Sequence, residues 1–196
     1  MYGCLQPITI KHIFMKIRPH IVIAFFLFLM VGCDNKLIPL KYAYQQEAYE
    51  FKTNSSKDRA WDQLIDLLTK NGLAIKTINK ADGLITTETT SFLDSYTWEN
   101  RHGTIMSPNA IVVCSRYRGM LTVGQSFKPN TLTGQWIVRL KEEEGKTAVM
   151  VKLANASGEV FVTGSDAHQP GEPASPYALQ VRSTGVFERS IEHSLN

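Results

Sequence analysis

The chain has 196 residues, of which 43% are hydrophobic and 20% are charged, and this composition excludes a wholly disordered protein. Its formal net charge of +3 comes from the first 32 residues, which contain Lys11, Lys16 and Arg18 and no acidic residue. Residues 33–196 carry 18 Lys and Arg against 18 Asp and Glu, so their formal balance is zero. The balance after residue 32 gives no general attraction for nucleic acid.

The first feature in chain order is a short apolar run. Lys16 and Arg18 precede ten apolar residues, Ile21 to Met30. A positive start, a short apolar core and small residues at its end are the plan of a secretory signal. Ten residues are fewer than the roughly 20 that a membrane-spanning helix needs, although a short anchor that is retained uncut is the alternative.

The end of this run is more specific. Met30-Val31-Gly32-Cys33 resembles the lipobox of bacterial lipoproteins, with Met30 in place of the usual Leu. The resemblance implies that residues 1–32 are a signal peptide and that Cys33 becomes the acylated N-terminus, held by more than one lipid chain. It also makes Met15 the expected start, so that residues 1–14, including Cys4, would be an over-annotated extension.

The two residues after Cys33 bear on the destination of the protein. In enterobacterial lipoproteins, an Asp at the position of Asp34, reinforced by an Asn at the position of Asn35, resembles a signal for retention in the inner membrane. We therefore expect a lipid-anchored protein on the periplasmic face of a membrane. The inner membrane is favoured if Asp34 acts in this way, and the outer membrane is expected otherwise.

Residues 33–46 are predicted to form a lipidated tether that lifts a single domain, 47–196, off the membrane. A strand at about 47–53 precedes a helix at about 57–71, for which Ser55 or Ser56 is the expected N-cap and Gly72 the terminator. The apolar residues that recur at helical spacing are Ala60, Trp61, Leu64, Ile65 and Leu68.

The following segments favour strands. Two strands, about 73–79 and 84–91, flank the turn Asp82-Gly83. Residues 92–109 are predicted to be a loop or an irregular strand continuation. One or two strands are predicted around Gly119, within 109–127. A hairpin of 135–142 and 146–154, joined at Glu144-Gly145, and a short strand at 158–164 follow. The last prediction is a closing helix over 175–195, which begins at Ser175 and is weakened by Gly185.

This order predicts an α+β fold. Five or six antiparallel strands form a sheet whose apolar face is covered by two amphipathic helices, giving a two-layer sandwich. The inner face of the closing helix is expected to consist of Val181, Thr184, Phe187 or Glu188, Ile191 and Leu195.

Residues 55–90 resemble one known family. Ala60-Trp61 opens a helix, Leu64 and Leu68 lie on its face, Gly72 ends it, and Asp82-Gly83-Leu84-Ile85-Thr86-Thr87 follows. This series is similar to the BamC (NlpB) lipoproteins. The resemblance implies a helix-grip fold, in which a long helix lies across an antiparallel sheet, and a role in outer-membrane protein assembly. It carries over no functional residue, because the matching positions are core and turn positions.

The candidates for catalytic or metal chemistry are few. Cys114, His102, His168 and His193 are scattered among a predicted strand, two loops and a helix end, and no short metal-ligand spacing occurs. The only feature that favours a reactive Cys114 thiol is the cationic side chain of Arg116, two residues further along the chain. Glu142-Glu143-Glu144 lies at a predicted hairpin tip, which favours a solvated turn. We therefore expect no catalytic residue, no metal and no cofactor.

One segment has the composition of a recognition surface. Arg116 and Arg118 flank Tyr117, and Trp98 and Tyr96 occur in the loop 94–108. Arginine and aromatic residues are enriched at protein interfaces, although alternating outward residues of an ordinary strand would look the same. The sequence thus predicts a partner surface that contains Trp98, Arg116 and Arg118.

The expected function is that of a non-catalytic binding or scaffold lipoprotein in cell-envelope or outer-membrane protein assembly, with an envelope protein as its partner. The alternative is a lipoprotein component of a secretion or conjugation apparatus, which would use the same anchor and domain. A third class, an envelope hydrolase, is less favoured because no nucleophile–base motif occurs.

Overall fold

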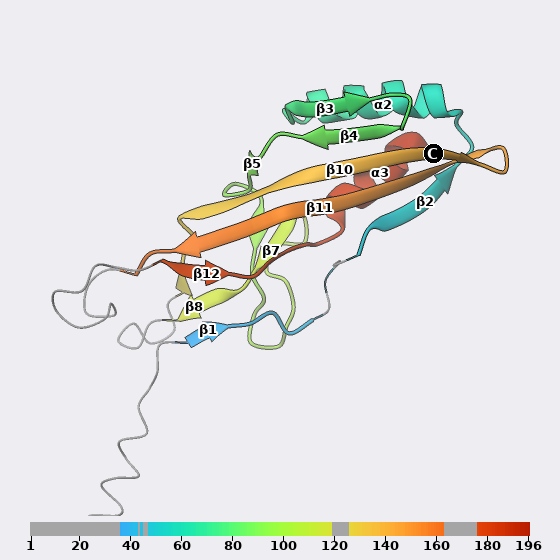
Figure 1. Ribbon diagram of the computed structural model, residues 1–196. Coiled ribbons are helices and arrows are strands. Elements are labelled where there is room, and N and C mark those ends of the chain that lie inside the picture. The colour runs from blue at the N-terminus through green and yellow to red at the C-terminus, as the bar shows by residue number, and fades with distance from the viewer. Residues whose placement is uncertain (1–35, 43, 45–46, 119–125, 163–175) are drawn as a thin grey trace, which may run out of the picture. The chain divides into compact units, whose positions relative to one another are not determined.

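The computed structural model describes residues 36–42, 44, 47–118, 126–162 and 176–196 (Figure 1). The chain divides into two units, Met1–Asp34 and Asn35–Asn196, and all described residues belong to the second. The predicted signal peptide, Cys33, Asp34, Asn35, His168 and Ser175 lie outside the described residues, as does most of the predicted strand 120–127.

Two helices and thirteen strands are described. In chain order they are β1 (Lys36–Ile38), β2 (Tyr49–Thr53), α2 (Lys57–Lys70), β3 (Ile75–Asn79), β4 (Leu84–Thr87), β5 (Thr90–Ser91), β6 (Tyr96–Thr97), β7 (Val112–Cys114), β8 (Arg116–Arg118), β9 (Ser126–Phe127), β10 (Thr131–Glu143), β11 (Lys146–Val160), β12 (Tyr177–Leu179), β13 (Val181–Ser183) and α3 (Val186–Leu195). The predicted α+β class is confirmed, with mostly antiparallel pairing; β6 and β7 pair in parallel.

A long hairpin, β10–β11, forms the centre of the main sheet (Figure 1). It turns at Glu144 (φ 52°) and Gly145 (φ 76°), two successive left-handed residues that match a tight hairpin turn. The predicted turn is confirmed. Of the short strand expected at 158–164, residues 158–160 are the end of β11, residues 161–162 belong to no strand, and residues 163–164 lie outside the described residues. Asn155, at φ 50°, accompanies a register shift opposite Thr133 and Gln135, so one strand continues through this bulge.

The prediction of five or six strands in a single sheet is wrong. The main sheet has seven strands in the order β12-β11-β10-β4-β3, with β2 paired to β11 and β5 to β10. Two three-stranded sheets, β1-β8-β9 and β13-β7-β6, accompany it in the described part of the chain. Strands of two or three residues lack the period-2 pattern that reveals longer ones, so the sequence does not show them.

Helix α2 follows the prediction closely. The Ser56 hydroxyl accepts a hydrogen bond from the Arg59 amide at 3.4 Å, and Gly72 follows the helix at φ 70°. The buried residues of α2 are Ala60, Trp61, Leu64 and Leu68, as expected, with Ile65 partly buried. Each large apolar side chain buried in this way contributes about 1.5–3 kcal/mol.

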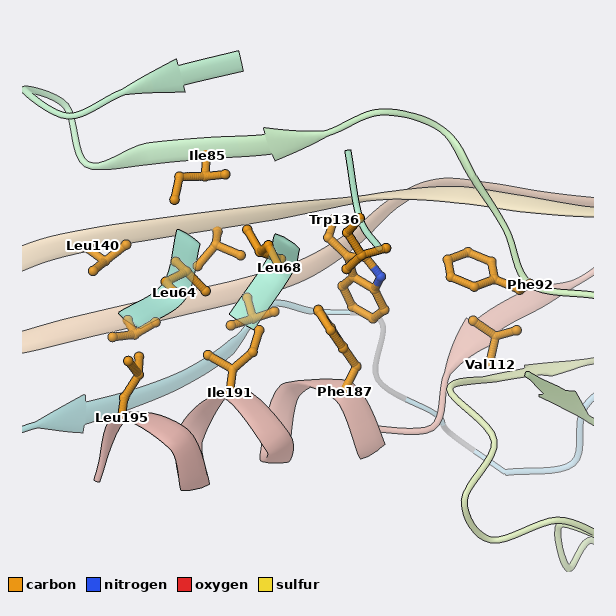
Figure 2. Packing of buried hydrophobic residues seen from close by; sticks show 14 of the residues in the cluster. Leu64, Leu68, Ile85, Phe92, Val112, Trp136, Leu140, Phe187, Ile191 and Leu195 are labelled. Atoms are coloured by element: carbon orange, nitrogen blue, oxygen red, sulfur yellow. The ribbon is translucent and has the colours of Figure 1, made fainter. Parts of the chain in front are cut away.

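Both helices pack on one face of the main sheet and contact each other (Figure 1). Figure 2 shows Trp136 of β10 between Phe187 of α3 and Phe92. The ring centroids of Trp136 and Phe187 are 4.4 Å apart, and those of Trp136 and Phe92 are 6.4 Å apart in an edge-to-face arrangement. Leu64 and Ile191, from the two helices, complete the apolar layer between helices and sheet.

The closing helix predicted over 175–195 is wrong in its first half. Residues 177–179 and 181–183 are β12 and β13, and α3 begins only at Val186. Gly185 adopts φ 80°, which is not helical, and separates the two structures. Val181 and Ser183 are buried on a strand paired to β7, so long-range pairing overrides the local helical spacing. Phe187, Glu188, Ile191 and Leu195 do form the buried face of α3.

Among the described residues, no helix has the length and apolar character required to cross a membrane.

Candidate functional site

Trp98 borders a hollow of about 280 Å³ beside β6. Its residues are Leu93, Asp94, Tyr96, Thr97, Trp98, Met106, Ser107 and Lys128. The rings of Tyr96 and Trp98 meet at 5.6 Å and 70°, while Leu93 is 38% exposed and Met106 is 60% exposed. The hollow therefore combines aromatic and exposed apolar surface with one acidic and one basic side chain. We call it the Trp98 hollow.

The loop that carries Trp98 is held by a short ladder. The Met106 amide donates to the Trp98 carbonyl at 3.0 Å, and the Ser107 amide donates to the Thr97 hydroxyl at 2.9 Å. Residues 96–97 also pair with Val112 and Val113 of β7. The segment that could not be assigned from sequence is thus an ordered turn, which presents Trp98 and Met106 together.

Arg116 and Arg118 lie elsewhere. Both belong to β8, on either side of the buried Tyr117. Arg116 lines a second, small hollow with Ile38 to Lys41, and no hydrogen bond, ion pair or ring contact of the described residues joins either arginine to Trp98. The structure thus separates the predicted partner surface into an aromatic hollow and a basic strand.

The segment 36–44, placed in the tether by the sequence, is docked on the domain. Lys36, Leu37 and Ile38 pair with Arg118, Tyr117 and Arg116 in antiparallel register. The Leu40 amide donates to Gln180 Oε1 at 3.3 Å. These residues were predicted as part of the tether 33–46, and in the structure residues 36–38 pair with β8 of the domain.

Glu99 fastens this segment, and sequence reasoning missed it. Its carboxylate, only 5% exposed, accepts hydrogen bonds from the Lys41 amide at 2.8 Å, the Tyr42 amide at 3.2 Å and the Tyr44 hydroxyl at 2.7 Å. Burial, together with the bond to Glu99, raises the pKa of the Tyr44 phenol. We call Glu99 and its three donors the Glu99 clasp. A single acidic residue in a polar loop gives no pattern that would reveal it.

Tyr42 closes over Gly103 next to the clasp. Gly103 has φ 88°, and a Cβ placed on it would lie 2.3 Å from the Tyr42 ring. The glycine is therefore required both by its backbone conformation and by the close approach of the ring. Lys41 Nζ also donates to the Arg101 carbonyl, which ties the segment to the same loop.

The open face of the main sheet carries a further hollow of about 270 Å³, formed by β2, β10 and β11. Its apolar part includes Ala148 and Met150. Charged residues of both signs surround it, namely Glu50, Lys52, Arg139, Lys141 and Glu143, and Lys52 pairs with Glu143 at 3.3 Å. The mixed charge favours no one class of ligand.

The residues considered for chemistry are dispersed. Cys114 is buried, and burial raises the pKa of its thiol to about 12, so the thiol is protonated at neutral pH. His102 is exposed and accepts from Arg101 Nε at 3.1 Å, whereas His193 lies in the last turn of α3. In the described ranges, no three His, Cys, Asp or Glu side chains are grouped to hold a metal ion.

No family model matches the chain, and no curated protein is significantly similar to it.

Proposed function

We propose that the protein is a lipid-anchored, non-catalytic binding module on the periplasmic face of a bacterial membrane. The observation that carries the proposal is the sequence Met30-Val31-Gly32-Cys33 at the end of a short apolar run. The docking of residues 36–44 supports it, because a folded segment that begins soon after Cys33 suits a protein whose N-terminus is held at a surface.

The fold that we propose is of the helix-grip type, as the resemblance to BamC lipoproteins implies. The residues of this resemblance lie in α2, β3 and β4. In support, α2 packs across the main antiparallel sheet through Leu64 and Leu68 and shares its layer with α3. A role in envelope or outer-membrane protein assembly follows from the same resemblance, and a secretion or conjugation apparatus is the alternative setting.

The anchor is tested by Cys33→Ser. We expect this variant to lose acyl labelling in cells fed a labelled fatty acid and to lose its mature, lipid-modified form, because the acylated sulfur is absent. Cys114→Ser is the matched control and should keep full labelling, since Cys114 is buried in the domain. Undiminished labelling of the Cys33→Ser variant would refute the anchor.

The Trp98 hollow is the surface that we propose for an envelope protein partner. Aromatic residues and Met are among the types enriched at interfaces, and Trp is one of the residue types enriched at hot spots. With a photo-crosslinking residue at exposed Met106, we expect a discrete crosslinked product in intact cells, reduced at least about tenfold by Trp98→Ala.

The control places the same crosslinker at Glu142, an exposed residue of the β10–β11 turn region. Crosslinking of the same protein from both positions, or a Met106 product unaffected by Trp98→Ala, would show that the hollow is not the contact surface. A product identified as a barrel-assembly protein favours the first setting, and a secretion-channel protein favours the alternative.

A further inference from the structure

The three-stranded sheet β1-β8-β9 has one buried face and one outward face. Tyr117 of β8 is buried, with its ring centroid 5.8 Å from that of Phe127 and 4.4 Å from that of Tyr177. Side chains alternate along a strand, so Arg116 and Arg118 point to the face opposite Tyr117. Arg116 is half-buried and Arg118 is exposed.

This outward face is strongly basic. Residues 37–41, 114–118 and 127–128 contain four basic residues and no acidic one, although the balance of residues 33–196 is zero. The four are Lys41, Arg116, Arg118 and Lys128. We call this the basic face.

Carboxylates near the basic face do not neutralise it. Glu99 lies beside Arg116, but three donors of the segment 41–44 occupy its oxygens. Asp94 shares the Trp98 hollow with Lys128 without an ion pair. The ion pairs found in the described part of the chain, Lys52–Glu143 and Lys80–Asp58, involve none of the four basic residues.

The acidic turn Glu142–Glu144 lies at the far end of the long hairpin. The basic face adjoins the other end, because Tyr117 packs in one cluster with Val160, the last residue of β11. Since β11 has 15 residues, the two ends are roughly 50 Å apart at about 3.3 Å per residue. The basic face and the Glu142–Glu144 turn thus lie at opposite ends of the long hairpin.

The basic face is also the part of the domain closest in sequence to the proposed anchor. Only Asp34 and Asn35 lie between Cys33 and β1. An extended chain covers at most about 3.6 Å per residue, so the three residue steps from Cys33 to Lys36 can span at most roughly 11 Å. The Glu99 clasp and the pairing of β1 with β8 hold residues 36–42 against the domain, so this segment adds no length to the connection.

We propose that the basic face lies against an anionic phospholipid surface and that it orients the anchored domain with the Glu142–Glu144 turn away from the bilayer. The proposal rests on the proposed lipid anchor for the position of this face, and on basic residues that form no ion pair with a described residue for its chemistry. The negative potential of anionic lipids attracts Lys and Arg mainly within a Debye length, about 8 Å at physiological salt, and a connection this short allows the basic face to come that close to the lipid headgroups. Each such residue strengthens the contact about fivefold at low salt.

The experiment uses the full chain, processed in cells and reconstituted into vesicles of phosphatidylcholine alone or with 30% phosphatidylglycerol (about one anionic lipid in three). A water-soluble acetylating reagent labels lysines, and mass spectrometry measures the rate at each site. We expect phosphatidylglycerol to slow labelling of Lys128 at least about fivefold and to leave Lys146, at the far turn, unchanged. High salt should remove the difference.

Charge variants test the assignment to the arginines. Arg116→Gln with Arg118→Gln should abolish the protection of Lys128, whereas Arg139→Gln with Lys152→Gln, the same charge change on the open face of the main sheet, should preserve it. Equal Lys128 rates in the two lipids, or protection that survives the arginine pair, would overturn the proposal.

Flotation of the same samples separates this test from that of the anchor. Failure to float with phosphatidylcholine vesicles contradicts the anchor. Protection of Lys128 by phosphatidylglycerol at high lipid concentration would still support the basic face in that case, and its absence would refute it.

Discussion

The Glu99→Gln variant should release the segment 36–44 from the domain. A Gln side chain has one acceptor oxygen in place of two, so it cannot serve the Lys41 and Tyr42 amides and the Tyr44 hydroxyl together. Hydrogen bonds to a charged group contribute about 1.5–3 kcal/mol each, and we expect the free energy of unfolding to fall by about 2–4 kcal/mol. Amide hydrogen exchange at Lys41 and Tyr42 measures the release directly.

Two comparison variants make this prediction specific. Tyr44→Phe removes one of the three donors and should have a smaller effect, about 1 kcal/mol. Glu88→Gln makes the same chemical change at an exposed position and should leave stability and exchange unaltered. Slow exchange at Lys41 and Tyr42 in Glu99→Gln, equal to that of the unmodified protein, would show that strand pairing alone holds the segment.

Replacement of Glu188 should stabilise the protein at neutral and alkaline pH. Glu188 is fully buried in the first turn of α3, and neither carboxylate oxygen has a hydrogen-bond partner among the residues that the structure describes. Burial raises the pKa of its carboxyl; the nearby Ser183 hydroxyl and Arg189 guanidinium act in the opposite direction but do not outweigh burial.

This raised pKa fixes the direction of the pH dependence. The unfolded chain loses the Glu188 proton near the ordinary value for Glu, whereas the folded protein holds it to higher pH. Between the two pKa values the unfolded state binds fewer protons, so the free energy of unfolding falls as pH rises through this window. The contribution of the neutral carboxyl is complete below the unfolded pKa and lost above the folded one.

Glu188→Met removes the buried carboxyl while keeping an apolar side chain of similar length. We expect the free energy of unfolding at pH 8 to rise by about 1–3 kcal/mol, the usual cost of an unpaired buried polar group, with a smaller gain near pH 4. Urea unfolding at the two pH values measures both. Glu142→Met, at the exposed turn, should not change the pH dependence. Equal destabilisation by Glu188→Met at both pH values would mean that the carboxyl makes favourable contacts.

Local signals explain which elements were predictable. Helix α2 has its cap at Ser56, an apolar stripe and Gly72 within one continuous stretch, and the β10–β11 hairpin has alternating residues around Glu144-Gly145. Strands β1 and β13 have only three residues each, and their partners, β8 and β7, are far away in the sequence. Such strands are specified by long-range pairing, which a single sequence does not display.

The candidate site likewise combines residues that the sequence indicates with contacts that only the fold creates. The types of the surface residues, Trp98, Arg116 and Arg118, were identified from composition, but their grouping depends on how β6, β7 and β8 pair. Glu99 was missed because its role arises only when residues 41–44 fold back onto it, 55 to 58 positions earlier in the chain. Glu188 was considered only as a possible face residue of a helix, and its burial depends on the packing of α3 against the sheet.

The docked segment would limit how far the domain can move from the membrane if Cys33 is the lipid anchor. With the proposed anchor, a free tether would let the domain leave the bilayer surface, whereas β1 begins only three residues after Cys33, the residue proposed to be acylated. The Trp98 hollow and the basic face share Lys128 at their border, so a domain held in this way would present the hollow close to the membrane surface. Membrane proximity suits a partner that is itself embedded in the membrane.

The most direct measurement is the mass of the N-terminal peptide of the protein purified from membranes. The proposed anchor predicts a peptide that begins at Cys33 and carries the added mass of more than one acyl chain. An unmodified peptide that spans Gly32 and Cys33 would contradict both the processing and the lipid anchor.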